Sequence, residues 1–303
     1  MKQYSISNKF FNDGLIIEKN KDSDGIKKLS QKKIAETFYK YGFIYFKNFK
    51  INNADFFKFT DAYTLKYAND AGRRKVKFNN SKIMSVDLGN KEIPLHSEAS
   101  FSPSWPEIIW FYCSIPSVKS GFTTVVDGVK VYENLKLSTK KFFLANQIKY
   151  KLLIPYKKTE NQKKIKINIK KKIKLKPWLL PFAGTSETKI SLKESFIKTN
   201  FSRYAINSSS KSQKPTFCNH LLPAIYRDEP QILDFKMSNG KVIPKKIVDE
   251  IKNLTTELSY KIKWKKGDFC MIDNRRFMHG RTKISTQEKR EMSVVQTLIS
   301  KFY

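Results

Sequence analysis

The sequence predicts a mainly β protein with a few flanking helices, arranged as a sandwich or a barrel. From residue 82 onward, short apolar segments rich in β-branched and aromatic residues follow one another, with Pro and Gly between them. Hydrophobic residues make up 40% of the 303 residues and aromatic residues 14%, which is enough apolar material for a large core. Evenly spaced short strands of this kind typically close into a barrel or pack as two sheets.

The first part of the chain is expected to alternate helix and strand. Residues 26–41 carry apolar side chains at near-helical spacing, and Gly42 ends that pattern. Residues 42–49 are rich in β-branched and aromatic residues and predict a strand. A second helix is predicted over residues 53–68, with Asn53 as its N-cap.

The rest of the chain is predicted to be mostly strand. The periodicity of the apolar residues predicts strands at 82–88, 108–115, 122–126, 147–154, 267–273 and 291–299, and helices at 131–137, 139–146 and 244–259. We find no internal repeat. Because sandwiches and barrels of this size often form one unit, we expect a single domain over residues 1–303.

Two segments interrupt this pattern. In the lysine-rich stretch 157–176, apolar residues alternate with lysine, which predicts either a surface hairpin or an insertion. Residues 183–215 are rich in Ser, Thr, Asn and Lys and contain few candidates for a core. We therefore expect this second segment to form loops that cover a site like a lid.

The cysteine usage and the apolar runs indicate a cytoplasmic protein. Cys113, Cys218 and Cys270 are far apart and form no C-x-x-C pair, so neither a disulfide framework nor a zinc site is expected. No apolar run approaches the roughly 20 residues of a membrane-spanning helix. The N-terminal residues lack the apolar stretch of a secretory signal.

The histidines are the scarcest chemically informative residues, with only three in the chain. His96 and Glu98 lie two positions apart in PLHSEASF, and on an extended strand such residues leave the same face. His279 follows a predicted buried strand and a turn. Two imidazoles and one carboxylate with open coordination positions are the ligand set of non-haem Fe(II) oxygenases. An isolated H-x-E is usually structural, so the prediction of a metal site depends on the surrounding residues.

The surrounding residues do carry a specific resemblance. The chain resembles the TauD/TfdA family of Fe(II)/2-oxoglutarate-dependent dioxygenases in four stretches: HSEASFSPSWPEIIWFYCSIP, SGFTTVVDG, WKKGDFCMIDNRRFMHGR and KREMSVV. It is most similar to the branch with H-x-E, which includes SyrP-like and clavaminate-synthase-like oxygenases. The resemblance runs from about residue 26 to residue 303 but leaves out 157–176. It implies a double-stranded β-helix (jelly-roll) core.

The resemblance also implies roles for individual residues. His96, Glu98 and His279 match the iron ligands. Thr123, in the string SGFTTVVD, matches the hydroxyl that contacts the carboxylate of 2-oxoglutarate. Arg290 follows His279 at the family's spacing for the arginine that binds the distal carboxylate. A guanidinium suits that task because it holds a carboxylate through two parallel hydrogen bonds.

The chemistry that the resemblance implies is hydroxylation of an unactivated C–H bond in a small molecule. Fe(II) would be the metal, and 2-oxoglutarate and O2 the co-substrates. Related halogenases carry a small residue at the position of Glu98, where chloride binds, so the glutamate favours hydroxylation. Desaturation and ring closure use the same ligand set and remain open.

The substrate is expected to be an amino acid or an amino-acid derivative, either free or bound to a carrier protein. Taurine-processing relatives place a second arginine where this chain has Val294, so taurine is not expected. For His220, a purely structural role is equally open. Six residues beside the predicted ligands or in the FCNHL segment are candidates to line the substrate pocket: Ser97, Ala99, Ser100, Phe101, Asn219 and His220.

The net charge of +32 arises from 59 basic and 27 acidic residues, and all but eight of the basic residues are lysine. Lysine, isoleucine and asparagine share A/T-rich codons, so coding bias on a solvated surface explains the excess without a partner. Readers of nucleic acid favour arginine, and nucleic acid is therefore not an expected partner. A basic face would also steer the docking of an acidic carrier protein.

Two other classes of function stay open on the sequence alone. One is a protein that binds or modifies nucleic acid through its basic surface. The other is a catalytically silent jelly-roll protein that only binds a ligand. The complete ligand set together with Arg290 argues against the silent protein, since function resides in the site and not in the fold.

Overall fold

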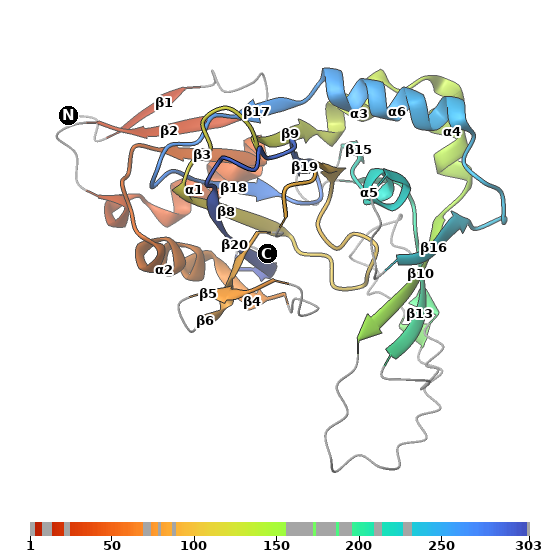
Figure 1. Ribbon diagram of the computed structural model, residues 1–303, viewed down its shortest axis with the longest axis horizontal. Coiled ribbons are helices and arrows are strands. Elements are labelled where there is room, and N and C mark those ends of the chain that lie inside the picture. The colour runs from red at the N-terminus through yellow and green to blue at the C-terminus, as the bar shows by residue number, and fades with distance from the viewer. Residues whose placement is uncertain are drawn as a thin grey trace, which may run out of the picture.

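The computed structural model describes residues 4–7, 14–20, 25–68, 74–77, 80–86, 89–155, 172–173, 186–187, 196–208, 214–226 and 232–301. Two β-sheets pack face to face in these residues, with helices on the outside and a long antiparallel ribbon projecting from one end (Figure 1). None of the helices in the described ranges is both long and apolar enough to cross a membrane.

The larger sheet carries most of the strands. Its order is β1 (Tyr4–Ser7), β2 (Leu15–Lys19), β3 (Phe43–Lys47), β18 (Phe269–Asp273), β8 (Ile108–Ile115), β20 (Glu291–Ser300), β6 (Asn80–Ser85) and β5 (Val76–Lys77), and β4 (Thr64–Tyr67) also pairs with β20. β2 and β3 run parallel, and the other pairs are antiparallel. Strands from both ends of the chain therefore lie side by side at the centre of the sheet.

The smaller sheet has four antiparallel strands. Their order is β17 (Tyr260–Ile262), β9 (Thr123–Asp127), β19 (Phe277–Arg281) and β7 (Ile93–His96). Val125 of β9, Ile262 of β17 and Phe277 of β19 pack into one apolar cluster with side chains of the larger sheet. This shared cluster forms the layer between the two sheets.

The alternation of side chains along the strands separates two core layers. In β8, Ile109, Phe111 and Cys113 point to the smaller sheet, whereas Trp110 and Tyr112 point to the opposite face. Such alternation follows from the two-residue period of a strand. Both faces of the central strands are thus buried, which explains why these segments read as continuous apolar runs.

Two helices cover the outer face of the larger sheet, as Figure 1 shows. α1 (Gln31–Tyr41) follows the short 3-10 helix η1 (Ile26–Lys28), and the side chain of Ser30 accepts a hydrogen bond from the backbone N–H of Lys33. α2 (Asn53–Tyr63) is capped by Asn52, not by the predicted Asn53, because the Asn52 side chain accepts from the backbone N–H of Asp55. α2 also ends before the predicted residue 68, since β4 begins at Thr64.

A second group of helices packs beside the smaller sheet. It consists of α3 (Gly128–Asn134), α4 (Leu137–Ala145), α5 (Leu221–Tyr226) and α6 (Lys245–Glu257). Their apolar side chains share one buried cluster with the base of the ribbon. The ribbon is β11 (Lys172–Ile173), β12 (Ser186–Glu187), β13 (Phe196–Arg203), β10 (Ile148–Pro155) and β16 (Ile232–Met237), and β14 (Ile206–Ser208) pairs separately with β15 (Pro215–Phe217).

The ribbon changes the expectation for residues 183–215. Instead of loops alone, this segment contains β12, β13 and β14 and the beginning of β15. β13 pairs with β10 along eight residues, and the buried Phe201 opposite Tyr150 supplies apolar contact that the polar composition concealed. The lysine-rich stretch 157–176 lies outside the described residues apart from β11. The predicted lid over the site stays a prediction.

Candidate metal centre

Two adjacent strands of the smaller sheet bring two histidines together. His96 of β7 and His279 of β19 are direct partners in the antiparallel register. The centroids of their imidazole rings lie 4.6 Å apart, and both residues are buried. Because directly opposed residues in such a pair lie within contact distance, the strand register alone places two histidines that are remote in the chain side by side.

Glu98 reaches the same point from a turn. β7 ends at His96, and residues 98–100 form a turn in which Ala99 has a φ of 52°. The expectation that His96 and Glu98 leave one face of a strand is therefore wrong, because the strand stops before Glu98. The two side chains converge nevertheless, and one ligand atom from each of His96, Glu98 and His279 lies within 4.8 Å of the other two.

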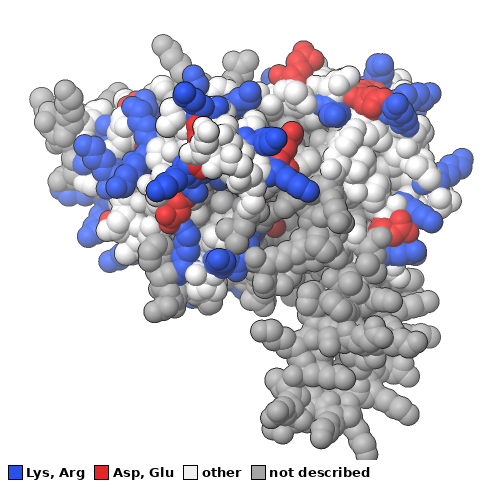
Figure 2. All heavy atoms as spheres, viewed as in Figure 1, with Lys and Arg blue, Asp and Glu red and all other residues white. Residues whose placement is uncertain are grey.

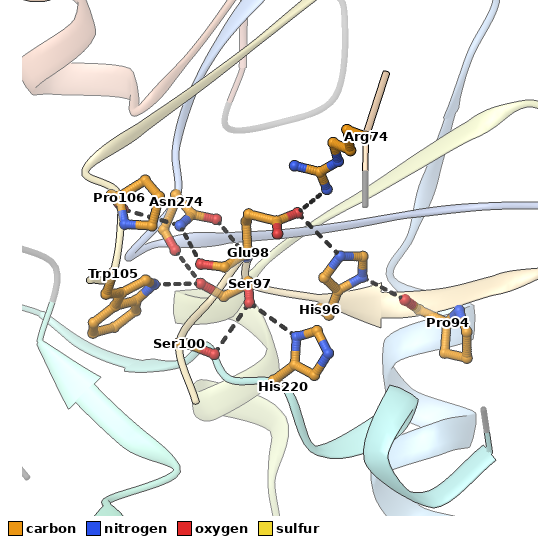
Figure 3. A network of polar contacts seen from close by, with 10 residues as sticks. All are labelled: Arg74, Pro94, His96, Ser97, Glu98, Ser100, Trp105, Pro106, His220 and Asn274. Atoms are coloured by element: carbon orange, nitrogen blue, oxygen red, sulfur yellow. Dashed lines mark hydrogen bonds and ion pairs between the residues drawn. The ribbon is translucent and has the colours of Figure 1, made fainter. Parts of the chain in front are cut away.

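The turn that carries Glu98 is held by Asn274 (Figure 3). The backbone N–H of Glu98 donates to Oδ1 of Asn274 at 2.8 Å, and Nδ2 of Asn274 donates to the carbonyl oxygens of Glu98 and Pro106 at 3.0 and 2.9 Å. The hydroxyl of Ser97 donates to the carbonyl oxygen of Asn274 and accepts from Nε1 of Trp105. Asn274 is fully buried, so these bonds are not exchanged with water and fix the turn.

The hydrogen bonds around His96 orient it toward Glu98. Its Nδ1 lies 2.8 Å from the carbonyl oxygen of Pro94, and its Nε2 lies 3.8 Å from Oε2 of Glu98. With Nδ1 donating to Pro94, the lone pair of Nε2 faces the carboxylate. This is the usual way in which a protein sets the tautomer of a metal-binding histidine.

Neighbouring charges set the protonation states. Burial raises the pKa of the Glu98 carboxyl, but the guanidinium of Arg74 and the hydrogen bond with His96 lower it more, so the pKa lies well below its usual value. Burial and the neighbouring His96 hold the pKa of His279 well below its usual value. At neutral pH the carboxylate is ionised and His279 is neutral, which are the forms that bind a metal.

The residues fit a divalent ion. Nδ1 of His279 is buried and has no hydrogen-bond partner within the described residues. Buried polar atoms are normally paired, so an unpaired nitrogen in this position indicates a missing partner. Two neutral imidazoles and one carboxylate of intermediate hardness suit ferrous iron.

A polar corner lies beside this cluster. Nη2 of Arg290 donates to the hydroxyl of Thr123 at 2.9 Å, and Nε1 of Trp264 donates to the same hydroxyl at 2.8 Å. Nε of Arg290 is buried without a hydrogen-bond partner in the described part of the chain. Burial, followed by the nearby Arg281, lowers the pKa of Arg290 to about 10, which leaves it charged at neutral pH.

Gly121 makes room for Arg290. It has a φ of +67°, and a Cβ there would lie 2.7 Å from Ile284 Cγ1 and 3.3 Å from Arg290 Cδ. Only glycine adopts this conformation without strain. Ser120, which replaces the first glycine of the family string, accepts a hydrogen bond from the backbone N–H of Ser285 and so helps to fix this turn.

One cavity connects the ligand cluster with the polar corner. Its described lining combines the three predicted metal ligands, three arginines, Thr123 and several apolar residues: Arg74, Val86, Ile93, His96, Glu98, Phe111, Thr123, His279, Gly280, Arg281, Arg290 and Val294. Sequence reasoning assigned no role to Arg74. It also assigned none to Asn274, although Asn274 belongs to the string that ends in HGR.

The six predicted substrate residues are not part of this described lining. Ser97 and Ser100 bond to the turn itself, and the Asn219 side chain accepts from the backbone N–H of Leu221 at the start of α5. His220 comes closer to the ligands, with its ring centroid 4.9 Å from that of His96 and 4.6 Å from that of Phe101. Their contact with a substrate stays a prediction, and so does that of Ala99.

Comparison with known families and structures agrees with this arrangement. A family model described as "Taurine catabolism dioxygenase TauD, TfdA family" matches residues 17–296. No curated protein matches the chain.

Several solved structures share the fold. The PvcB protein from Pseudomonas aeruginosa has a TM-score of 0.58 at 12% identity, covering 95% of this chain and 86% of PvcB. AAD-2 in complex with Mn(II) and N-oxalylglycine has a TM-score of 0.58 at 15% identity, covering 98% and 97%. A putative alpha-ketoglutarate dependent 2,4-D dioxygenase from Burkholderia xenovorans has a TM-score of 0.55 at 15% identity, covering 97% and 96%. The two packed sheets are therefore the expected jelly-roll core.

Proposed function

The chain belongs to the TauD/TfdA family of Fe(II)/2-oxoglutarate-dependent dioxygenases, and on this premise we propose that it hydroxylates an unactivated C–H bond of an amino acid or an amino-acid derivative. The co-substrates are 2-oxoglutarate and O2. We assign His96, Glu98 and His279 as the metal ligands. The observation that supports this assignment most directly is the convergence of their ligand atoms within 4.8 Å of one another.

The polar corner is assigned to 2-oxoglutarate. The buried Nε of Arg290 lacks a hydrogen-bond partner among the described residues, and a carboxylate beside the guanidinium would accept its proton. Thr123 offers its hydroxyl at the same place, held there by Trp264. A neutral ligand would leave the buried charge of Arg290 unbalanced, which is costly.

The bound iron and 2-oxoglutarate together supply the oxidising power for the C–H bond. The chain's own part is to hold its three ligands in place and to keep water from the reacting atoms. Val86, Ile93, Phe111 and Val294 form apolar walls of the cavity. Asn274 holds the turn of Glu98, and Pro94 fixes the ring of His96.

Glu98 favours hydroxylation over halogenation. A carboxylate side chain occupies the position that a halide would need beside the metal. PvcB is described as an Fe, alpha-ketoglutarate dependent oxygenase from an isonitrile synthetic pathway, which is chemistry on a small molecule. This supports a small-molecule substrate for the present chain.

The basic surface bears on the proposed carrier protein. Figure 2 shows lysine and arginine side chains spread over the described part of one face, with aspartate and glutamate among them. Such a face would attract an acidic partner weakly and over a broad area. The proposal of an acidic carrier predicts that turnover of a carrier-bound substrate falls steeply with salt, while turnover of a free amino acid does not.

The proposed cofactor chemistry is tested by anaerobic titration with Fe(II) and then 2-oxoglutarate. We expect the visible metal-to-ligand charge-transfer band of the family in the wild type, and no band in His96→Ala or His279→Ala. His220→Ala is the matched control, since it removes an imidazole 4.9 Å from the His96 ring but no proposed ligand. A wild type without the band, or a His279→Ala variant that keeps it, would contradict the assignment.

The reaction is tested by mass spectrometry of free and carrier-bound amino acids after turnover. A product that has gained one oxygen atom supports hydroxylation. A product that has gained chlorine, or has lost two hydrogens, would replace hydroxylation by halogenation or by desaturation or ring closure.

A further inference from the structure

Arg74 brings a guanidinium to the metal ligands. Its Nη2 donates to Oε2 of Glu98 at 2.7 Å, and only 11% of its side chain is exposed. Figure 3 shows Arg74 reaching Glu98 from the side opposite to Ser97 and Trp105. Arg74 therefore lies in the open part of the site and not in the network that fixes the turn.

The described lining of the cavity carries an excess of positive charge. Arg74, Arg281 and Arg290 contribute three guanidinium groups, whereas Glu98 contributes the single carboxylate of the described lining. A ferrous ion and the 2-oxoglutarate dianion cancel each other, so binding both leaves this excess unchanged. In a cavity with apolar walls, such an excess favours an anion.

The other two arginines already have assignments. Nη2 of Arg281 donates to the carbonyl oxygens of Gly89 and Lys91 at 2.7 and 2.8 Å, which ties it to the backbone. Arg290 lies beside Thr123 in the polar corner. Arg74 is therefore the guanidinium best placed to meet a substrate next to the metal.

The present contact of Arg74 already shows the geometry that a carboxylate ligand requires. When Glu98 binds the metal, its negative charge is shared with the ion and neutralises Arg74 less completely. A planar guanidinium fork pairs best with a second carboxylate. We propose that Arg74 binds a carboxylate of the substrate, so that the oxygenase acts on a free carboxylic acid; this inference rests on the proposed function.

The inference decides between the two forms of the substrate. In a free amino acid the group that meets Arg74 is the α-carboxylate. Attachment to a carrier protein converts this group into a neutral thioester, which gives a guanidinium no negative charge to pair with. The chain is thus assigned to free amino acids and not to carrier-bound ones.

The test uses the whole protein loaded anaerobically with Fe(II) and 2-oxoglutarate. The twenty common L-amino acids and the corresponding carboxamides are titrated in, and the apparent Kd is read from the change in the charge-transfer band. Each carboxamide is a neutral analogue of its acid. Arg74→Gln removes the charge, and Arg74→Lys keeps a charge without the fork. Lys75→Gln is the matched control, because it removes an exposed charge next along the chain.

We expect at least one free amino acid to bind the wild type more tightly than its carboxamide. In Arg74→Gln that acid should bind on the order of 10- to 100-fold more weakly, while its carboxamide changes little. Arg74→Lys should recover part of the loss, and Lys75→Gln should behave as the wild type. The band itself should form in all four proteins at saturating Fe(II) and 2-oxoglutarate.

Two failures are distinguishable. If the band does not form in the wild type, the proposed function itself is wrong. If the band forms but no acid in the panel binds more tightly than its carboxamide, or if Arg74→Gln keeps that preference, only the role of Arg74 is overturned. A panel in which nothing binds counts against the role as well, because a carboxylate site in this cavity should detect simple amino acids at millimolar concentration.

Discussion

The two faces of the larger sheet are built from the same strands but differ in what they leave unpaired. On the face covered by α1 and α2, aromatic rings pack closely, and the Phe46 and Phe269 ring centroids are 4.3 Å apart. On the face toward the smaller sheet, the apolar layer gives way to a cavity where His279 and Arg290 carry buried nitrogens without described partners. The comparison teaches that the helix-covered face stabilises the fold, whereas the cavity face is completed by its ligands.

The largest expected effect is on the cavity face. His279→Ala should reduce turnover to background, about a thousandfold or more, because the metal contributes several kcal/mol to lowering the barrier. The melting temperature of the metal-free protein should change by only a few degrees, and Fe(II) should no longer raise it. Calorimetry with and without Fe(II) measures both. A His279→Ala protein that Fe(II) still stabilises as it does the wild type would remove the distinction between the faces.

The counterpart on the helix-covered face is Phe269→Ala. Phe269 is fully buried against Phe46, Phe56 and Phe59. Truncation of such a ring should lower the free energy of unfolding by about 3–5 kcal/mol, measured by urea denaturation. The variant that remains folded should still bind Fe(II) with wild-type affinity.

Leu137→Ala is the control for Phe269, since Leu137 is 66% exposed. It should change the unfolding free energy by less than about 0.5 kcal/mol. A loss of Fe(II) affinity in folded Phe269→Ala would show that the two faces are coupled.

Asn274 lies between the two regions in its effect. Asn274→Ala leaves the backbone N–H and carbonyl of Glu98 without these hydrogen bonds, so the affinity for Fe(II) should fall about 10- to 100-fold. Asn207→Ala is the matched control, because Asn207 is also buried and donates to three backbone carbonyls away from the ligands. Both variants should lose stability, but only Asn274→Ala should lose metal affinity. Equal Fe(II) affinities in the two variants would refute the role of Asn274.

The smallest expected effect concerns pH. The carboxylate of Glu288 accepts hydrogen bonds from the backbone N–H groups of Val118, Lys119 and Ser120. Slight desolvation opposes them, but these bonds lower the pKa of Glu288 below its usual 4.5. A lowered pKa contributes stability above pH 4.5 that is lost as the pH falls through the folded-state pKa.

Glu288→Gln should therefore be less stable than the wild type at pH 6, and the difference should shrink toward pH 3. Urea denaturation at several pH values measures it. A difference that stays constant across this range would show that the charge of Glu288 is irrelevant to the turn before Thr123.

The metal ligands could be predicted because histidine is scarce and the string around each ligand is specific. The reason offered for Glu98 was wrong, since the end of β7 depends on where its pairing with β19 stops. Asn274 could not be predicted as the partner of Glu98, because the two are 176 positions apart and meet only through folding. Similarly, adjacent asparagines at 52 and 53 are equally good caps by residue type, and the path of the chain selects Asn52.

The sequence by itself determined the class of fold, most of the helices and strands, and the chemical types of the ligands. Periodicity, caps and residue types act over a few positions, so they can be read without the rest of the chain. Only the tertiary structure decided that His96 faces His279, that Asn274 holds the turn of Glu98, and that Arg74 reaches the same carboxylate. These meetings depend on strand register and on the packing of whole sheets, which no local segment specifies.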